Sequence, residues 1–579
     1  MKKSIHISAI AIIILLFSIT AIAQKAETKS DIIFRAIQDE LTRTMSDLNH
    51  PEAGKPFFVG FYVTEGTFMN SSATLGAITT SFSRKIVSTS YRFMFGSYDL
   101  NDENFEETPP KEMVFPRKIS APLECDYAGI RRVLWNAADQ SCKSASRNYV
   151  TKKKYFEKNP SQKPDFPDYI KQEPVIMELA QIANMPASVQ TDSLVRALSY
   201  IFRKYENISS SDVSFNLVNC NLYLINTEGT RLRIPFCFAS VDISAQITNG
   251  GGENLSGSLS FVSMEPFDLI HDKTIAGKLN MLADYLVDVA KAPKLEDDYN
   301  GPVLFTGTTS VPQVMEALFA GKDALIASRE EVKNTPVYRK TLPQNTNTTE
   351  SKIGKRFMPE AFSVTLKPKL DSYKGIKLFG KNLVDYEGTV SPDEIRLVEN
   401  GILKDLLRNR VPSSKTATIS NGCLLPNISP SGIYSSVEPG VVFFSSSQAK
   451  TNDELKKALL ASAREKGLDF ALIVRPVVYD ANNTSSAYYM VSVANGSETL
   501  LHPLSVRSGG GKLINHIAGC SNQEIVQNTL NNNQSGMSGS SVFGTPASII
   551  LPDAILFSDM SAEALDASVD KSLLPQRDE

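Results

Sequence analysis

The spacing of apolar residues along the chain predicts several amphipathic helices. Between Asp31 and Leu48, apolar positions recur every three or four residues, as on the buried face of a helix. We expect this helix to pack against the core. Thr451 and Glu454 form a capping signal at the start of a later helical stretch. Further helices are predicted, in chain order, over residues 126–149, 193–205, 311–320 and 453–466.

Strand patterns alternate with these helices and change in character along the chain. Residues 57–98 are rich in Phe, Tyr, Val and Thr between Gly and Asn turns, which is typical of strands. From about residue 360 onward, short strands and turns dominate. Residues 152–171 are crowded with Lys, Pro and Asp. We expect them to form a solvated connector, with a binding surface as the alternative.

A polar turn over residues 296–301 marks a change between two parts of the chain. We therefore place the main domain boundary between residues 290 and 297. The predicted fold is α+β with two domains. A helix-and-sheet domain spans residues 24–295, and a β-rich domain spans residues 296–560. Residues 561–579 are expected to form a polar tail.

The amino terminus has the features of an export signal. Lys2 and Lys3 precede an apolar stretch over residues 9–17, and small residues end at Ala23. The apolar stretch is short for a membrane span, and no Cys lies nearby to accept a lipid. We expect cleavage between Ala23 and Gln24 and a periplasmic or extracellular location. An uncleaved signal anchor is the alternative.

Composition excludes several classes of protein. The 579 residues are 42% hydrophobic and 21% charged, which is typical of globular chains and not of disordered, fibrous or multi-spanning ones. The 60 basic and 63 acidic side chains give no net positive charge for a nucleic acid. Only five His residues are present, so few imidazole groups are available for a metal or acid/base site.

Two of the cysteines lie on a predicted β-hairpin. Cys220 and Cys237 stand on strand-like runs that flank a turn centred on Glu228 and Gly229. A two-residue turn places the two thiols directly opposite each other, near disulfide distance. A three-residue turn shifts the register by one and places them on opposite faces of the sheet. We predict a disulfide, with two reduced thiols as the alternative. The pairing of the other cysteines stays open: Cys125, Cys142, Cys423 and Cys520.

The residues alone indicate no catalytic site. No G-x-S-x-G, phosphate loop, H-E-x-x-H or H-E-x-x-x-H motif occurs. His516 and Cys520 are four residues apart and could share a helical face, but two ligands make a poor zinc site. Asp385 and Glu387 form a carboxylate pair, although nothing in the sequence sets their distance.

Four short motifs in the second half occur in an order typical of one known family. They cover residues 298–305, 384–389 with 397–407, 420–422 and 544–552. Through them the chain resembles the TldD/PmbA proteins, historically called modulators of DNA gyrase and grouped with zinc metallopeptidases. The resemblance implies a TldD/PmbA-like two-domain fold. It also implies a structural role for the turn residues Asp385, Glu387, Gly388, Asn400, Gly401, Asn421 and Gly422.

The chain departs from the family where the metal would bind. Catalytic members carry H-E-x-x-x-H on the helix after the strand 302–305, because two His one turn apart can hold zinc while Glu activates water. Residues 311–319 contain no His. Those members also supply a Cys from a Gly-rich segment, where residues 535–541 contain none. The chain therefore resembles the metal-free subunit, for which the resemblance implies a heterodimer with a zinc-bearing paralogue.

Three functions remain possible from the sequence. The first is a non-catalytic exported subunit that forms a peptide cleft with an H-E-x-x-x-H-bearing paralogue, itself without metal or cofactor. The second is an active peptidase with an atypical metal site, for which the nearby donors are His502, His516 and Cys520. The third is a stand-alone peptide-binding protein of the cell envelope, as a monomer or homodimer. Whether the chain is an enzyme is left open by the missing motif.

Overall fold

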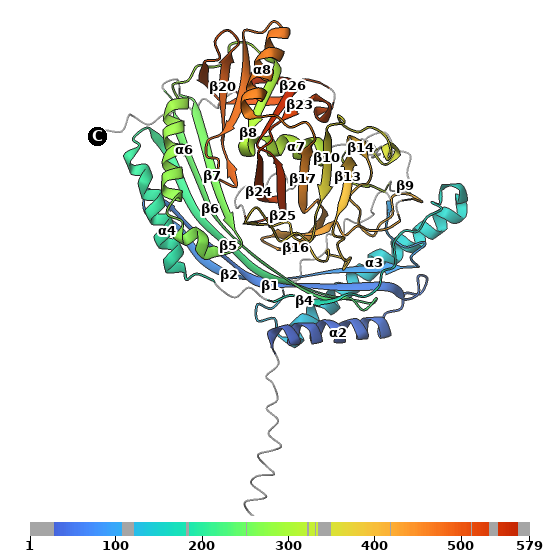
Figure 1. Ribbon diagram of the computed structural model, residues 1–579. Coiled ribbons are helices and arrows are strands. Elements are labelled where there is room, and N and C mark those ends of the chain that lie inside the picture. The colour runs from blue at the N-terminus through green and yellow to red at the C-terminus, as the bar shows by residue number, and fades with distance from the viewer. Residues whose placement is uncertain are drawn as a thin grey trace, which may run out of the picture.

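The computed structural model places most of the chain in two layered bodies of helix and sheet (Figure 1). The predicted signal peptide and its cleavage site at Ala23 lie outside the described residues, as does the Gly-rich segment 535–541. The described residues are 28–106, 121–180, 185–249, 252–320, 324–329, 332–333, 349–416, 418–510, 512–531 and 542–565.

A large antiparallel sheet dominates the first half. Its strand order is β19-β7-β6-β5-β1-β2, with β4 pairing to β6. In Figure 1 the long strands curve beneath the second half. The strands are β1 (Pro56–Thr74), β2 (Ala77–Phe95), β4 (Ile176–Glu178), β5 (Ile208–Asn226), β6 (Arg231–Thr248), β7 (Asn254–Ser263) and β19 (Asn483–Thr484).

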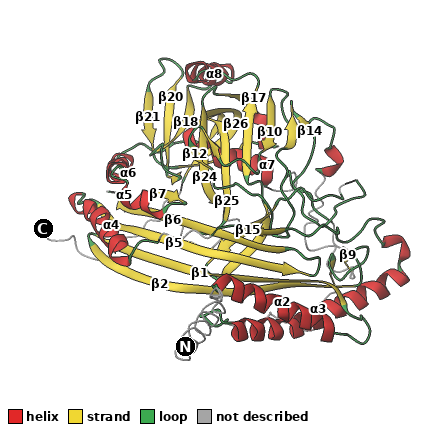
Figure 2. Cartoon of the chain, turned by 60° about the horizontal axis from the view of Figure 1, so that its bottom comes forward, coloured by secondary structure: helices red, strands yellow, loops and turns green. Residues whose placement is uncertain are grey.

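Alternation along β5 explains how the large sheet packs on both faces. Its odd-numbered residues, such as Phe215 and Tyr223, face the helices. Its even-numbered residues, such as Val218 and Leu222, face the second half of the chain. Figure 2 shows α2 and α3 near one end of the sheet and α4 to α6 near the other. These helices are α2 (Lys29–Asp47), α3 (Tyr127–Lys158), α4 (Ser188–Tyr200), α5 (Pro266–His271) and α6 (Ile275–Val289).

Two further sheets enclose the main core of the second half. The first has the order β14-β13-β10-β17-β25-β24 and the second the order β21-β20-β18-β8-β26-β22, with β23 pairing to β26. The first sheet consists of β10 (Phe362–Leu366), β13 (Ile395–Glu399), β14 (Ile402–Leu403), β17 (Val441–Ser446), β24 (Glu524–Asn531) and β25 (Thr545–Pro552). The second consists of β8 (Tyr299–Thr306), β18 (Phe470–Pro476), β20 (Ser486–Ser492), β21 (Glu498–Leu501), β22 (Leu504–Ser508), β23 (Ile517–Cys520) and β26 (Ala554–Ala564).

Two helices and three small strand pairs complete the second half. Helix α7 packs into the main core, and α8 covers the outer side of the second sheet through Leu455 and Leu459. The helices are α7 (Ser310–Phe319) and α8 (Asn452–Glu465). The paired strands are β3 (Phe105–Glu106) with β9 (Val332–Lys333), β11 (Ser372–Tyr373) with β12 (Ile376–Lys377), and β15 (Leu424–Ser429) with β16 (Gly432–Val437).

The predicted helices are confirmed, with one correction of length. α8 begins at the predicted capping box, in which the Thr451 hydroxyl accepts from the Glu454 N–H and the Glu454 carboxylate accepts from the Thr451 N–H. α3 runs nine residues further than expected, to Lys158. The prediction of a solvated connector over residues 152–171 is therefore wrong in part. Lys152 and Asp168 are both buried. The ion pair between them offsets the cost of removing each charge from water.

The carboxyl-terminal strand also extends beyond its predicted end. β26 pairs with β8 and β22 up to Ala564, so residues 561–564 belong to a sheet and not to a polar tail. Residues 566–579 lie outside the described part of the chain. The domain limits at residues 295 and 296 stay a prediction. β8 begins at Tyr299, yet β19 returns from the second half to pair with β7.

The predicted register of the cysteine hairpin is wrong. Asn226 pairs with Thr230 around a three-residue turn, so Cys220 lies opposite Phe236 and Cys237 lies opposite Asn219. The one-residue shift places the two thiols on opposite faces of the sheet, in different core clusters. Both cysteines are buried and free. The disulfide between Cys220 and Cys237 is therefore not formed.

No helix in the described ranges is both long enough and apolar enough to cross a membrane.

Candidate functional site

The acidic turn that carries the family resemblance lies between the two halves of the chain. The Asp385 carboxylate accepts the backbone N–H groups of Glu387 (3.0 Å) and Thr389 (2.8 Å) and thereby closes the turn. Gly388 has a φ of +89°, and a Cβ there would lie 2.8 Å from the Thr230 methyl group. The sequence Asp-x-Glu-Gly is thus needed for close contact with the hairpin of the large sheet.

The other two turns that carry the family resemblance lie within the second half of the chain. Asn400 and Gly401 both have positive φ, +48° and +75°, and connect β13 to β14. The strand after this turn, β14, has only two residues. The Asn421 amide accepts from the Arg408 N–H at 2.8 Å and donates to the Leu406 carbonyl at 2.7 Å. Gly422 follows with a φ of +71°. In this structure, these residues form turns through their backbone conformation or their side-chain hydrogen bonds.

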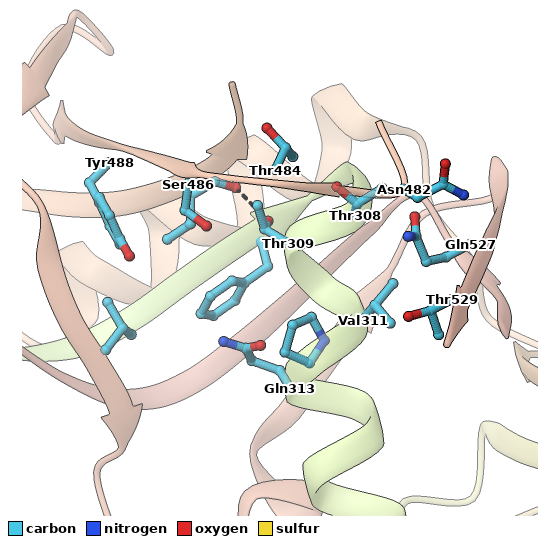
Figure 3. A pocket seen from close by; sticks show the side chains of 14 residues that line it. Thr308, Thr309, Val311, Gln313, Asn482, Thr484, Ser486, Tyr488, Gln527 and Thr529 are labelled. Carbon is cyan, nitrogen blue, oxygen red and sulfur yellow. Dashed lines mark hydrogen bonds between the residues drawn. The ribbon is translucent and has the colours of Figure 1, made fainter. Parts of the chain in front are cut away.

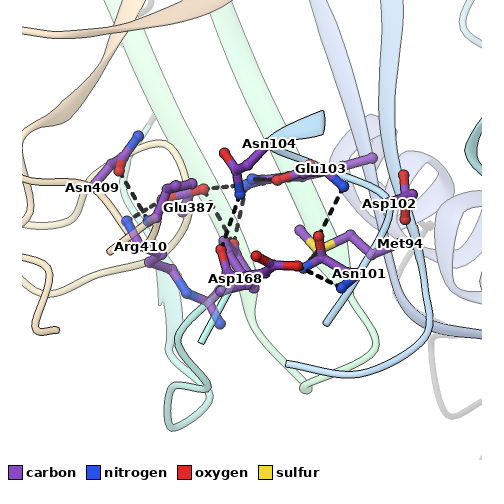
Figure 4. Close-up of polar contacts among 12 residues, drawn as sticks. Met94, Asn101, Asp102, Glu103, Asn104, Asp168, Glu387, Asn409 and Arg410 are labelled. Carbon is purple, nitrogen blue, oxygen red and sulfur yellow. Dashed lines mark hydrogen bonds and ion pairs between the residues drawn. The ribbon is translucent and has the colours of Figure 1, made fainter. Parts of the chain in front are cut away.

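Charged side chains from both halves meet at the acidic turn (Figure 4). We call this group the charged joint: Arg92, Glu103, Lys152, Asp168, Glu228, Arg329, Glu387 and Arg410. Arg92 donates to Glu103 at 2.6 and 2.7 Å and also pairs with Glu387. Arg410, which is 1% exposed, pairs with Glu228 at 2.6 Å and donates to the Ile170 carbonyl.

A second part of the charged joint surrounds Asp168. One carboxylate oxygen of Asp168 accepts from the Lys152 ammonium at 2.6 Å, and the other accepts from Arg329 at 2.5 Å. Lys152 also donates to the Glu103 carbonyl. Burial lowers the pKa of Lys152, against the opposite effect of the nearby Asp168. The joint therefore connects β2 and α3 to the second half through paired charges.

Two carboxyl groups beside the joint have raised pKa values. Burial, and then the negative charge of Glu387, raises the pKa of Asp385 to about 8. Burial likewise raises the pKa of Asp102 to about 7, and its carboxylate accepts from the Phe95 N–H. Neither Asp385 nor Glu387 lines a cavity described here, and both have structural partners. The carboxylate pair noted in the sequence therefore does not form a glycosidase-type site.

A separate cavity lies at the start of α7, where the resemblance locates the metal-binding helix (Figure 3). We call it the α7 pocket. Its volume is about 280 Å³. It is lined by Phe305, Thr308, Thr309, Val311, Pro312, Gln313, Val474, Asn482, Thr484, Ser486, Tyr488, Val506, Gln527 and Thr529. Among these described lining residues, no side chain carries a charge at neutral pH.

The polar side chains of the α7 pocket differ in how they are bonded. The Thr309 hydroxyl contacts the Thr306 and Val474 carbonyls, and Asn482 bonds to backbone groups of β7 and β24. The Gln313 Oε1 atom, in contrast, is buried and accepts no hydrogen bond. Figure 3 shows Gln313 on the first turn of α7 and Gln527 and Thr529 on another wall. Gln313 therefore lines the pocket with a buried acceptor that is unused within the described chain.

These residues do not fit a zinc ion. Zinc in proteins is held by imidazole, thiolate or carboxylate groups, whereas the α7 pocket offers amides and hydroxyls. His516 ends a short 3₁₀ turn and Cys520 lies in β23, so the two do not share a helical face. His502 lies in the bend between β21 and β22, and its backbone N–H donates to the Pro293 carbonyl. Across the described ranges, no three His, Cys, Asp or Glu side chains are grouped as metal ligands.

Sequence reasoning identified the position of the pocket but not its contents. The altered helix 311–319 indicated where a site would lie. Ser486 and Thr529, however, look like ordinary strand residues, and only the pairing of the second-half sheets brings them near α7. The charged joint was missed for the same reason. Its partners are separated by up to 295 residues, as for Arg92 and Glu387.

Comparison with known proteins agrees with this fold. Residues 334–495 match the model of the PmbA/TldA metallopeptidase C-terminal domain. A putative modulator of a DNA gyrase from Thermotoga maritima MSB8 has a TM-score of 0.53 at 14% identity, over 92% of this chain and 100% of that one. TldE from Thermococcus kodakarensis has a TM-score of 0.52 at 10% identity, over 91% of this chain and 100% of its own.

A third solved structure is similar, that of a putative modulator of DNA gyrase from Bacteroides thetaiotaomicron. Its TM-score is 0.53 at 12% identity, and the match covers 93% of this chain and 100% of that one. None of the curated proteins is significantly similar in sequence. Residues 334–495 thus match a PmbA/TldA metallopeptidase C-terminal domain, and the chain shares the fold of these solved structures, which supports the TldD/PmbA resemblance of the sequence.

Proposed function

We infer that this protein is a non-catalytic subunit that forms a peptide cleft together with a metal-bearing paralogue. The observation that supports this proposal is the α7 pocket. It lies at the start of the helix that corresponds to the metal-binding helix of catalytic TldD/PmbA proteins. Its described lining residues offer neutral amides and hydroxyls, and none of them supplies an imidazole, thiol or carboxylate. Such groups bind a substrate but do not hold zinc or activate water.

The test uses this chain and a family paralogue that carries the H-E-x-x-x-H motif, each purified alone and then together. We expect zinc in the paralogue alone, and cleavage of an unstructured peptide that rises strongly when both chains are present. The resin used for purification must not carry a metal. About one zinc per chain in this protein, lost on replacing His516 or Cys520, would overturn the proposal in favour of an atypical peptidase.

The same experiment addresses the stand-alone alternative. If this chain neither copurifies with the paralogue nor changes its peptidase activity, the subunit role is wrong. A variant with the exposed Glu52 replaced by Ala serves as the matched control, because Glu52 pairs with the exposed Lys154 and belongs neither to the described lining of the α7 pocket nor to the charged joint. This control should leave any stimulation of the paralogue unchanged.

Export forms part of the proposed function and rests on the sequence alone. A chain that starts at Gln24 would meet its paralogue and peptide outside the cytoplasm. The intact mass of protein from the native cell envelope tests this directly. A mass that includes residues 1–23 would contradict cleavage between Ala23 and Gln24.

A further inference from the structure

We propose that the α7 pocket binds an uncharged carboxamide group of a peptide, with Gln313 as the residue that recognises it. This inference rests on the proposed function, because it names the chemical group that the cleft would take. It is argued from the charge, bonding and size of the pocket.

The absence of charge among the lining residues restricts the ligand. Transfer of an ammonium, carboxylate or phosphate group from water into a site without a counter-charge costs several kcal/mol. The α7 pocket supplies none of the charged side chains that would offset this cost. Phe305, Val311 and Val474 instead give it apolar walls. The ligand is therefore neutral and partly apolar.

The bonding of Gln313 indicates which neutral group fits. Its Oε1 atom is buried without a donor, and a buried acceptor that lacks a partner is destabilising. A ligand N–H would satisfy this atom. The Gln313 amide also carries two N–H donors beside that oxygen. A carboxamide offers one acceptor and at least one donor in the same spacing, so the two amides can bond reciprocally.

Other lining groups can complete the contact. The side chains of Thr308 and Thr529 make no hydrogen bond to another described residue. A hydroxyl can donate or accept, so each can adapt to either end of an amide. Gln527 is 5% exposed, and its amide nitrogen already donates to the Asn528 carbonyl at 3.3 Å. Gln527 thus helps to form the wall, while Gln313 is available for the ligand.

The size of the pocket limits the ligand to one residue. A volume of about 280 Å³ lies just below the usual range for small-molecule sites. A carboxamide of this size has two sources in a peptide, which are the side chain of Asn or Gln and the main-chain peptide group. The chemistry is shared, and three probes distinguish the sources.

The test measures binding of three blocked amino acids to the isolated full chain by ligand-observed NMR. The probes are N-acetyl-glutamine methylamide, N-acetyl-methionine methylamide and N-acetyl-glutamate methylamide. We expect the glutamine probe to bind at least about tenfold more tightly than the glutamate probe. If the methionine probe binds as well as the glutamine probe, the source is the main chain. If it binds more weakly, the source is the side chain.

Variants link this binding to the pocket. Gln313→Met should abolish the preference for the glutamine probe over the glutamate probe, because it keeps the volume and removes the amide. Thr529→Val provides a second, independent change should Gln313→Met fold poorly. Gln38→Met is the matched control, since Gln38 is exposed on α2 and only contacts Thr42.

Three outcomes would overturn the inference. They are equal or tighter binding of the glutamate probe, no binding of any probe, or an unchanged preference in both pocket variants. None of these outcomes bears on zinc content or on association with a paralogue. The carboxamide inference can therefore fail while the subunit role stands.

Discussion

The charged joint and the α7 pocket both contain buried polar side chains, but their electrostatics are opposite. In the joint, four basic side chains meet four acidic ones, and Arg410, Lys152 and Asp168 are each no more than 2% exposed. In the pocket, every lining side chain is neutral and Gln313 has an unused acceptor. The charges of the joint are paired within the chain, although Glu228 Oε2 and Arg410 Nη1 are buried without a hydrogen bond, whereas the unbonded Gln313 Oε1 belongs to a side chain that lines a cavity.

This contrast separates structural residues from candidate functional ones. Asp385 and Glu387, which resemble a catalytic carboxylate pair in the sequence, are held in the joint region by partners of the same chain. Charge alone is therefore a poor guide to function in this fold. An orphaned atom in a cavity points to a ligand more directly than a charged motif does. The following predictions test that distinction, beginning with the largest effect.

Replacing Arg410 with Met should lower the free energy of unfolding by about 3–5 kcal/mol. The change leaves Glu228 buried without its guanidinium partner, and it removes the donors to the Ile170 carbonyl. Urea unfolding followed by circular dichroism measures the effect. Adding Glu228→Gln to the Arg410 variant should restore part of the loss. A loss below about 1 kcal/mol would show that the joint is no more stabilising than surface charges.

Replacing Asp385 with Asn should change how stability depends on pH. Burial raises the pKa of Asp385 to about 8 in the folded chain, from an ordinary value of 3.8. The stability that the protonated carboxyl group contributes to the fold is thus fully present below about pH 4 and is lost as the pH rises through about 8. Asn cannot ionise, so the variant should gain stability relative to the native chain over this interval. The gain should not exceed about 1.4 kcal/mol per pH unit.

The measurement is the unfolding midpoint at a series of pH values between about 4 and 9, a range that spans the folded and unfolded pKa values. The control is Asp393→Asn, because the Asp393 side chain is 90% exposed. Its curve should run parallel to that of the native chain. A parallel curve for Asp385→Asn would contradict a proton held at this position.

Replacing Gln313 with Met should leave stability unchanged or raise it by up to about 1 kcal/mol. The substitution removes a buried acceptor that has no donor, so no intramolecular hydrogen bond is lost. This sign is opposite to that expected in the joint. Thermal and urea unfolding beside the exposed Gln38→Met control check it. A loss above about 2 kcal/mol would mean that Gln313 has a structural partner in solution.

Replacing Glu52 with Ala should have the smallest effect, below about 0.5 kcal/mol. Glu52 and Lys154 form an ion pair at 3.1 Å, but both side chains are more than 60% exposed. Water and salt screen such pairs, and ordering the two side chains costs entropy. Urea unfolding at low and high salt gives the measurement. A larger effect would remove the distinction between surface pairs and the charged joint.

Much of the fold could be predicted because its signals are local. The apolar spacing of residues 31–48 and the capping box at Thr451 act within a few residues, and both helices form as expected. The lack of His in residues 311–319 could likewise be read from residue types. The register of Cys220 and Cys237 could not. It depends on whether the turn holds two or three residues, a small difference in backbone conformation that Glu228 and Gly229 do not decide.

The joint and the pocket could not be predicted because their contacts are distant in sequence. Lys152 appears in a run of lysines that is typical of a solvent-exposed surface, yet it is buried against Asp168. The helix α3 continues through that run and carries Lys152 inward. Long-range pairing of this kind leaves no periodic pattern. The same holds for Gln313, whose unused acceptor follows from packing alone.

The return of β19 to the large sheet gives the α7 pocket a mechanical connection to the first half. Asn482 receives a hydrogen bond from Val262 in β7 at 2.6 Å and donates to Asn528 in β24 at 3.1 Å. Through Asn482, one wall of the pocket is thus hydrogen-bonded to the large sheet and to the first sheet of the second half. A partner that changed the position of the large sheet relative to the second half would displace this wall and so alter the affinity of the pocket for its ligand. By reciprocity, a ligand in the pocket would strengthen or weaken the binding of that partner.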